Sequence, residues 1–297
     1  MEPRLSEGYL LTQFDRLVEQ GMVVYDRSYR TVVRSDKGLS FEFRILNGIA
    51  AKPQVSQDPT EHPSSRPSGC RPGGDITVSG YEIATISTTH LLTANKFPSA
   101  RPHYLILTRD GFRRQHEPLD IHDLAAARHV ISSLLPRRHL VIFNCGIDGG
   151  CSRMHKHMQV FPAPDDFTLW PDAAAEPELP FRFFMRRFRN GLPPPDDLLR
   201  TYRTLLRRAE RAVGHAALEG EAAVPHNVMA DRNWLVVVPR RSAGWDGLST
   251  NAAGMLGMVW ISSEDKLKAW LDRGPATVLA RLGVPADVDC ESTGRLS

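Results

Sequence analysis

The chain has 297 residues, of which 41% are hydrophobic and 24% charged, and its formal net charge is +3 at pH 7. This is the composition of an ordinary globular protein, so it excludes a disordered or fibrous chain. The pI near 8.7 comes without a concentrated run of Lys and Arg. We therefore expect small anionic ligands and no nucleic-acid partner.

Neither a membrane partner nor a secretory leader is expected. Charges interrupt every apolar stretch before the roughly 20 residues that a membrane span needs, and the charged N-terminus lacks the apolar core of a signal peptide. We expect a cytoplasmic protein, with the nucleus as a further candidate compartment. The four cysteines lack metal-binding or disulfide-framework spacing, so we expect free thiols: Cys70, Cys145, Cys151 and Cys290.

In chain order, apolar residues at helical spacing predict a helix over 7–22, and alternation predicts a strand over 41–49. Lys52–Gly74 is rich in Pro, Gly and Ser and has no hydrophobic period, which predicts a surface loop. The β-branched and aromatic segments 81–95 and 103–110 predict two strands of a hairpin.

Farther along, Asp120 and Asp123 form an acidic first turn that predicts a helix through residue 135. Segments 138–146 and 154–162 predict strands on either side of the glycine-rich loop 147–153.

The remaining elements expected are a surface helix over 196–216, strands over 226–230 and 233–241, and C-terminal helices over 249–261, 265–273 and 276–284. Antiparallel strands with helices packed outside them predict an α+β fold. We expect residues 1–165 to carry the motif strand and residues 166–297 to complete the same globular unit.

The run HKHMQV carries the strongest chemical signal. Side chains alternate along a strand, so His155, His157 and Gln159 are expected on one face. A neutral imidazole can attack phosphorus when its second nitrogen is held protonated by an acceptor, which makes His157 the candidate nucleophile. His155 could orient the phosphate or the neighbouring loop, and Gln159 could donate a hydrogen bond to a phosphate oxygen.

The preceding loop offers anion-binding groups. Gly149 and Gly150 allow backbone N–H groups to approach a phosphate, while Ser152 and Arg153 add donors. Asn144 ends the strand before the loop and could bind sugar or phosphate.

Residue spacing alone leaves other interpretations open. An HxH pair can ligate zinc or lie on a half-buried sheet edge, and we see no further ligands at suitable spacing. Glycines between strands can simply mark a turn, and this loop matches neither a Walker nor a Rossmann fingerprint.

The segment NCGIDGGCSRMHKHMQVFP resembles the active-site segment of the histidine-triad-like superfamily, in the branch of ATP adenylyltransferases, also called diadenosine tetraphosphate phosphorylases. NKFPSARPHYLILTRD and HNVMADRNWLVVVPRR resemble flanking segments of that branch, and the resemblance extends from about Phe41 to Leu282. HxHxQ itself is shared with galactose-1-phosphate uridylyltransferases. The resemblance implies a histidine-triad-like antiparallel sheet.

The resemblance also implies site roles. His157 would be the covalent nucleophile and Gln159 the amide beside the phosphate. The substrate-binding residues that it implies are Lys52, Asn95, Lys96, Asn144, Gly150, Cys151, Ser152, Arg153, Asn227, Trp234 and Arg240. This chain departs from the family pattern at Arg153-Met154 and at Asp231, whose carboxylate would repel an anion unless it points away or pairs with Arg232 or Arg240.

The expected reaction is phosphorolysis of diadenosine tetraphosphate to ADP and ATP, and its reverse, through an AMP–histidine intermediate. Mg²⁺ carried by the nucleotide would be the cofactor, with no dedicated protein metal site. We expect a monomer or weak oligomer that binds ATP, ADP, the dinucleotide and phosphate. The alternatives are a histidine-triad-type hydrolase, a transferase for a sugar nucleotide and a nucleotide sensor with little turnover.

Overall fold

The computed structural model describes residues 5–46, 68–165, 167–175, 178–214 and 223–286. Its centre is an eight-stranded sheet in which all neighbouring strands are antiparallel. The strand order is β3 (Glu82–Thr85), β4 (His90–Ala94), β5 (Tyr104–Thr108), β7 (His157–Pro162), β6 (His139–Cys145), β9 (His226–Ala230), β10 (Trp234–Pro239) and β8 (Phe184–Arg187).

A smaller sheet and six helices complete the described part. The smaller sheet has the order β1 (Arg30–Asp36), β2 (Leu39–Ile45) and β13 (Met258–Ile261), and a two-stranded ribbon joins β11 (Gly244–Trp245) to β12 (Leu248–Ser249). The helices are α1 (Glu7–Glu19), α2 (Ile121–Ser133), α3 (Pro195–Val213), α4 (Ala252–Met255), α5 (Glu264–Arg273) and α6 (Pro275–Leu282), with a short 3₁₀ turn at Trp170–Asp172.

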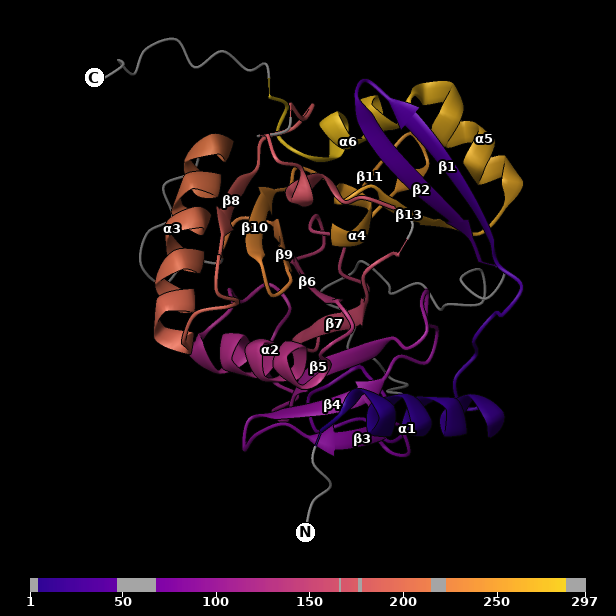
Figure 1. Ribbon diagram of the computed structural model, residues 1–297, viewed down its shortest axis with the longest axis vertical. Coiled ribbons are helices and arrows are strands. Elements are labelled where there is room, and N and C mark those ends of the chain that lie inside the picture. Colours follow the sequence, from indigo (N-terminus) through magenta and orange to yellow (C-terminus); the bar gives the residue numbers. More distant parts are fainter. Residues whose placement is uncertain (1–4, 47–67, 166, 176–177, 215–222, 287–297) are drawn as a thin grey trace.

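The large sheet separates two hydrophobic cores. One face packs against α1, α2 and α3, and the other packs against the smaller sheet and α4–α6 (Figure 1). This arrangement confirms the predicted α+β fold. Both proposed parts of the chain contribute strands to the large sheet, while the exact boundary at residue 165 stays a prediction.

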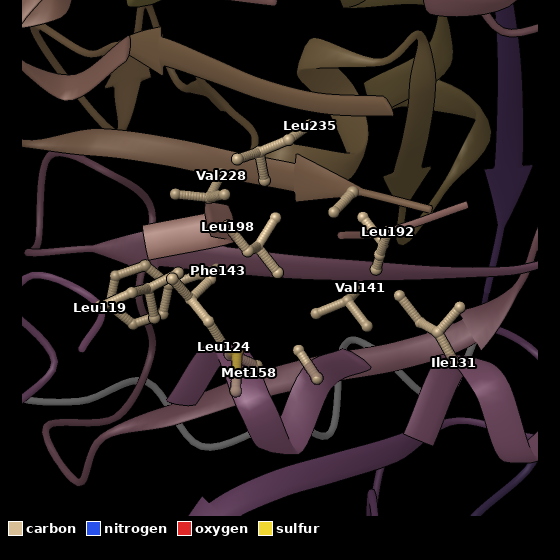
Figure 2. A pocket seen from close by; sticks show the side chains of 12 residues that line it. Leu119, Leu124, Ile131, Val141, Phe143, Met158, Leu192, Leu198, Val228 and Leu235 are labelled. Carbon is tan, nitrogen blue, oxygen red and sulfur yellow. The ribbon is translucent and has the colours of Figure 1, made fainter. Parts of the chain in front are cut away.

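The helical face is closely filled. Figure 2 shows aliphatic and aromatic side chains, among them Val141, Phe143 and Leu198, converging between the sheet and α2 and α3. The gap that they leave is about 20 Å³, which is room for about one water molecule. This gap is therefore too small for a nucleotide, and the side chains around it support the sheet.

Several predicted elements are confirmed. Helix α2 begins at a capping box in which Asp120 accepts the backbone N–H of Asp123, and Asp123 accepts that of Asp120. Strands β4 and β5 form the expected hairpin. Residues 68–74 form turns as predicted, while the rest of the predicted 52–74 loop lies outside the described residues.

Other predictions were wrong. Segment 81–95 is two strands, because the Ser87 hydroxyl accepts the N–H groups of Thr89 and His90 and turns the chain between β3 and β4. The predicted helix over 249–261 ends at Met255, and residues 258–261 form β13 beside β2. Strands β1 and β8, and the β11–β12 ribbon, were not predicted.

Candidate active site

Strand β7 presents its motif side chains to two different environments. Met158 and Val160 pack in the core beneath α2, whereas His157 and Gln159 face a pocket on the opposite side. The regular strand begins at His157, later than the predicted Met154, and His155 forms only an isolated bridge with Arg114. Alternation along the strand thus brings the two predicted side chains to one cavity.

The backbone of His157 is held by a buried side chain. Strands β6 and β7 pair as far as Ile142 and Gln159, and beyond that register the amide of Gln115 lies between them. Gln115 Oε1 accepts the His157 N–H at 2.8 Å, and its Nε2 donates to the carbonyl oxygens of His157 at 2.9 Å and Asn144 at 3.1 Å. The nucleophile candidate therefore sits where a side chain replaces a strand partner.

The imidazole of His157 is oriented by its own neighbour. Nδ1 lies 2.8 Å from the carbonyl oxygen of His155, which can only accept, so Nδ1 carries the proton. In the neutral ring Nε2 then has the lone pair. This is the tautomer that nucleophilic attack on phosphorus requires.

The pocket has a volume of about 240 Å³. Its lining combines apolar and aromatic side chains, Ile76, Tyr81, Phe97 and Leu105, with polar and cationic ones. The predicted site residues that line it are Asn95, Lys96, Ser152, Arg153, His157 and Gln159. Such a cavity can take a flat apolar ring and, beside the histidine, an anion.

Asp75 lines the same pocket and was missed from the sequence. Its carboxylate oxygens accept the N–H groups of Met154 at 2.7 Å and His155 at 2.9 Å. These bonds attach the end of the Pro/Gly-rich segment to the start of the motif. These two hydrogen bonds also offset the negative charge of Asp75, which would otherwise disfavour an anionic ligand in the pocket.

His155 shares the face of His157 but is completely buried and does not line the pocket. Its Nε2 donates to the Thr108 carbonyl oxygen at 2.9 Å, and burial lowers its pKa. A Cβ on Gly74 would come within 2.6 Å of its Nδ1. Of the two predicted roles, the position of His155 supports orienting the neighbouring segment.

Lys156, between the two histidines, projects to the helical face. Its ammonium lies 2.7 Å from the carboxylate of Asp123 on α2, which also contacts His90 Nε2 at 3.0 Å. Burial would raise the pKa of Asp123, but the hydrogen bond with His90 and the charge of Lys156 outweigh it and lower the pKa to about 2. The ion pair fastens the motif strand to α2.

The glycine-rich loop is fixed by a buried amide network. Asn227 Nδ2 donates to Asn144 Oδ1 at 3.0 Å and to the Gly149 carbonyl oxygen at 2.6 Å. Asn227 Oδ1 in turn accepts from Arg240 Nη1 at 2.6 Å, and Arg240 also donates to the Thr250 carbonyl oxygen. Asn227 therefore holds the loop, and Asn144 and Arg240 contact Asn227. None of the three lines the pocket, and their predicted contacts with substrate stay a prediction.

Neither Trp234, a predicted substrate contact, nor Asp231, a departure from the family pattern, lines the pocket. Trp234 is buried, and its Nε1 donates to Asp172. Asp231 pairs with Arg138 at 2.6 Å, which is neither of the two arginines expected, and it caps the N–H groups of Asn233 and Trp234. The carboxylate therefore points away from the anion site.

The last predicted positions are Lys52, Gly150 and the cysteines. Lys52 lies outside the described residues. Gly150 has φ +85° and lies against Thr250 and Asn251. Within the described residues Cys70, Cys145 and Cys151 form no disulfide, which agrees with the prediction, and Cys290 is outside the described residues. Burial raises the pKa of Cys151 to about 11, which makes it a poor nucleophile.

A family model described as the Ap4A phosphorylase N-terminal domain matches residues 22–180, which is over half of the chain. The chain belongs to the Ap4A phosphorylase family. A second model, the ATP adenylyltransferase C-terminal domain, matches residues 177–285.

Two yeast proteins are similar in sequence. Diadenosine 5′,5′′′-P1,P4-tetraphosphate phosphorylase 2 of Saccharomyces cerevisiae is 30% identical over 207 residues, which are 60% of this chain and 63% of that protein. Protein APA1 of the same yeast is 25% identical over 74% of this chain and 75% of its own length. The alignment thus spans less than two thirds of the first relative.

Solved structures share the fold. The crystal structure of yeast Ap4A phosphorylase Apa2 has a TM-score of 0.76 at 21% identity, covering 97% of this chain and 98% of that one. The Apa2 complex with Ap4A gives a TM-score of 0.73 at 21% identity over 96% and 99% of the two chains. The family fold therefore extends over nearly the whole chain.

None of the described helices combines the length and apolar character of a membrane span. Within the described residues, no group of three or more His, Cys, Asp or Glu side chains is arranged to hold a metal ion.

Proposed function

We propose that the chain is an adenylyl-transferring Ap4A phosphorylase, which converts diadenosine tetraphosphate and phosphate to ADP and ATP and also runs in reverse. The observation that carries this proposal is the 2.8 Å contact between His157 Nδ1 and the His155 carbonyl oxygen, at the wall of a pocket with Lys96 and Arg153. Family membership supplies the substrate class, which the name of one Saccharomyces relative, diadenosine 5′,5′′′-P1,P4-tetraphosphate phosphorylase 2, supports.

In the first step His157 Nε2 attacks the α-phosphorus of the dinucleotide. The N–P bond forms as the bond from that phosphorus to the bridging oxygen of the β-phosphate breaks, and ATP leaves with the electron pair. The Nδ1 proton stays on the ring, where the His155 carbonyl oxygen stabilises the positive charge that develops. In the second step a phosphate oxygen attacks the same phosphorus, the N–P bond breaks, and ADP leaves.

The surrounding groups act on the transferring phosphoryl group. Gln159, Ser152 and Arg153 line the pocket and can donate to its oxygens as charge builds. Lys96 and Asn95, at the end of β4, can hold the rest of the ligand. The apolar and aromatic side chains in the pocket lining, Ile76, Tyr81 and Phe97, suit a nucleobase.

A divalent cation, Mg²⁺ in this proposal, would reach the site bound to the polyphosphate chain. The pocket agrees with delivery of the cation by the polyphosphate, because both oxygens of the Asp75 carboxylate already accept backbone N–H groups. The cation would neutralise charge on the leaving polyphosphate.

Location and assembly belong to the same proposal. We place the enzyme in the cytoplasm and secondarily in the nucleus, as a monomer or weak oligomer that binds small nucleotides. Fractionation of cells and light scattering of the purified chain test these statements. A membrane-bound pool or a stable large oligomer would contradict them.

The decisive experiment follows the AMP group. Protein is incubated with α-labelled dinucleotide, denatured, and examined for acid-labile, alkali-stable label. We expect stoichiometric labelling of the wild type and none for His157→Ala, with His129→Ala as a matched control at an exposed histidine of α2. Label on His157→Ala would relocate the nucleophile, and an unlabelled wild type would overturn covalent transfer.

Product analysis separates the alternatives. Phosphate-dependent release of ADP supports phosphorolysis, whereas phosphate-independent release of AMP indicates a hydrolase. A preference for a sugar nucleotide donor would replace the substrate. Tight binding of dinucleotide with no product over hours would indicate a sensor.

A further inference from the structure

His103 is a buried histidine next to the pocket to which no function has been given. It directly precedes β5 and is 1% exposed. Its ring packs against Phe161, with centroids 5.2 Å apart, and against Trp260, with centroids 5.8 Å apart. These contacts hold the ring in place. The role of His103 then depends on the hydrogen bonds of its two nitrogens.

The backbone of Ser99 determines the tautomer. The Ser99 N–H donates to His103 Nδ1 at 3.1 Å, and a backbone N–H is always a donor. Nδ1 must therefore carry the lone pair, so the ring is neutral and its proton is on Nε2. The opposite edge of the imidazole consequently requires an acceptor.

That acceptor is the carbonyl oxygen of the Gln159 side chain. Gln159 Oε1 lies 3.0 Å from His103 Nε2. The other amide nearby, Asn95, presents its Nδ2 at 3.3 Å, and its Oδ1 accepts the Phe97 N–H. Since Nδ2 and Nε2–H are both donors, Asn95 cannot be the acceptor.

We propose that His103 is a positioning residue that sets which end of the Gln159 amide faces the phosphate. With Oε1 held by His103, the two N–H donors of Gln159 are left for the pocket that this side chain lines. The flipped amide would oppose two donors at His103 and turn a carbonyl oxygen toward an anion. This inference rests on the proposed function, because it assumes that a phosphate lies beside His157.

A double-mutant cycle tests the coupling. His103→Phe removes the donor and keeps an aromatic ring against Phe161 and Trp260, and Gln159→Ala removes the amide. We expect Gln159→Ala to lower kcat about 100-fold and His103→Phe about 10- to 100-fold, with smaller changes in KM, because the donor acts on developing charge. The double variant should match Gln159→Ala alone.

Two further variants separate positioning from simple packing. His103→Gln restores an N–H donor near the position of Nε2, so its kcat should be at least tenfold higher than that of His103→Phe. If His103→Phe does not fold, His103→Gln takes its place in the cycle. His129→Phe makes the same change at an exposed site and should match the wild type. Multiplicative losses in the double variant, or no recovery with His103→Gln, would overturn the proposal.

Binding measurements keep this test separate from the proposed function. Calorimetry gives the AMP affinity of the wild type, of the two single variants and of the double variant. These affinities form a second double-mutant cycle that does not depend on turnover. If the wild type binds AMP but forms no ADP from diadenosine tetraphosphate, phosphorolysis fails while His103 and Gln159 should still show non-additive losses of affinity. Additive losses there, or no AMP binding by the wild type, would overturn the role of His103.

Discussion

The side chain of Gln115 both donates to and accepts from the backbone of one residue, His157, as a neighbouring strand would. The two bonds measure 2.9 Å and 2.8 Å, and a third reaches the Asn144 carbonyl oxygen. The backbone of Gln115 adds to this, since its N–H donates to the Met154 carbonyl oxygen and its own carbonyl accepts the Gly146 N–H. One residue therefore joins the nucleophile strand to the glycine-rich loop.

Gln115→Met keeps the side chain's length but removes its three hydrogen bonds to buried backbone groups of His157 and Asn144. We expect the free energy of unfolding to fall by about 3 kcal/mol and kcat/KM to fall about 100-fold, because His157 shifts. Urea denaturation and steady-state kinetics measure the two effects. Gln20→Met, at an exposed site, should change stability by less than about 0.5 kcal/mol. Wild-type kinetics in Gln115→Met would show that the Gln115 side chain does not position His157.

The features that the sequence predicted depend on residues close together in the chain. The shared face of His157 and Gln159 follows from the period of a strand, and the start of α2 follows from its capping residues. In contrast, Gln115 and His103 act on residues that lie 42 and 56 positions away, and no short-range pattern marks them. Their roles depend on how β5, β6 and β7 meet in the folded sheet.

The misassigned segment 258–261 has a similar cause. Its sequence, MVWI, is a short apolar run whose hydrophobic period cannot distinguish a buried helix from a buried strand. Gly257 has φ +91° and ends the preceding turn, and the following residues find an edge in β2, more than 200 residues earlier. Asn144 and Arg240 both hydrogen-bond the side chain of Asn227, and none of the three lines the pocket, so their contacts with substrate stay a prediction.

Gly149→Ala should disrupt the glycine-rich loop, which is proposed to bind an anion. A Cβ there would lie 2.3 Å from the Cys145 carbonyl oxygen, and since that oxygen belongs to the backbone of β6, the loop itself must move. We expect AMP affinity, measured by calorimetry, to fall about tenfold or more. Gly8→Ala, where a Cβ meets nothing within 4 Å, is the matched control. Equal affinities for the two variants would contradict a role for the loop in binding.

His226 should make stability depend on pH between about 6.5 and 4. Burial lowers its pKa to about 4, while the unfolded chain has the ordinary value near 6.5. Below 6.5 the unfolded state binds the extra proton, so stability is complete above that pH and is lost as pH falls toward 4. The full effect is about 3 kcal/mol.

Thermal unfolding across this pH range checks the prediction. His226→Gln should flatten the profile relative to the wild type, although it also disturbs the bond to Tyr202 at 2.9 Å and lowers stability at every pH. His129→Gln, at an exposed histidine, should keep the wild-type slope. If His226→Gln retains that slope too, then His226 is not the group responsible, and buried His139, whose pKa burial also lowers to about 4, is the next to test.

Asp231→Asn should reduce stability without changing catalysis. The variant keeps an oxygen for the N–H groups of Asn233 and Trp234 but removes the charge beside Arg138, which retains Asp172. We expect a loss of about 1–3 kcal/mol in urea denaturation and kcat/KM within about twofold of the wild type, because Asp231 follows β9 at the end opposite Asn227 and the glycine-rich loop. Asp165→Asn, at an exposed acid, should change neither quantity. A large change in kcat/KM for Asp231→Asn would mean that this family departure acts on the ligand after all.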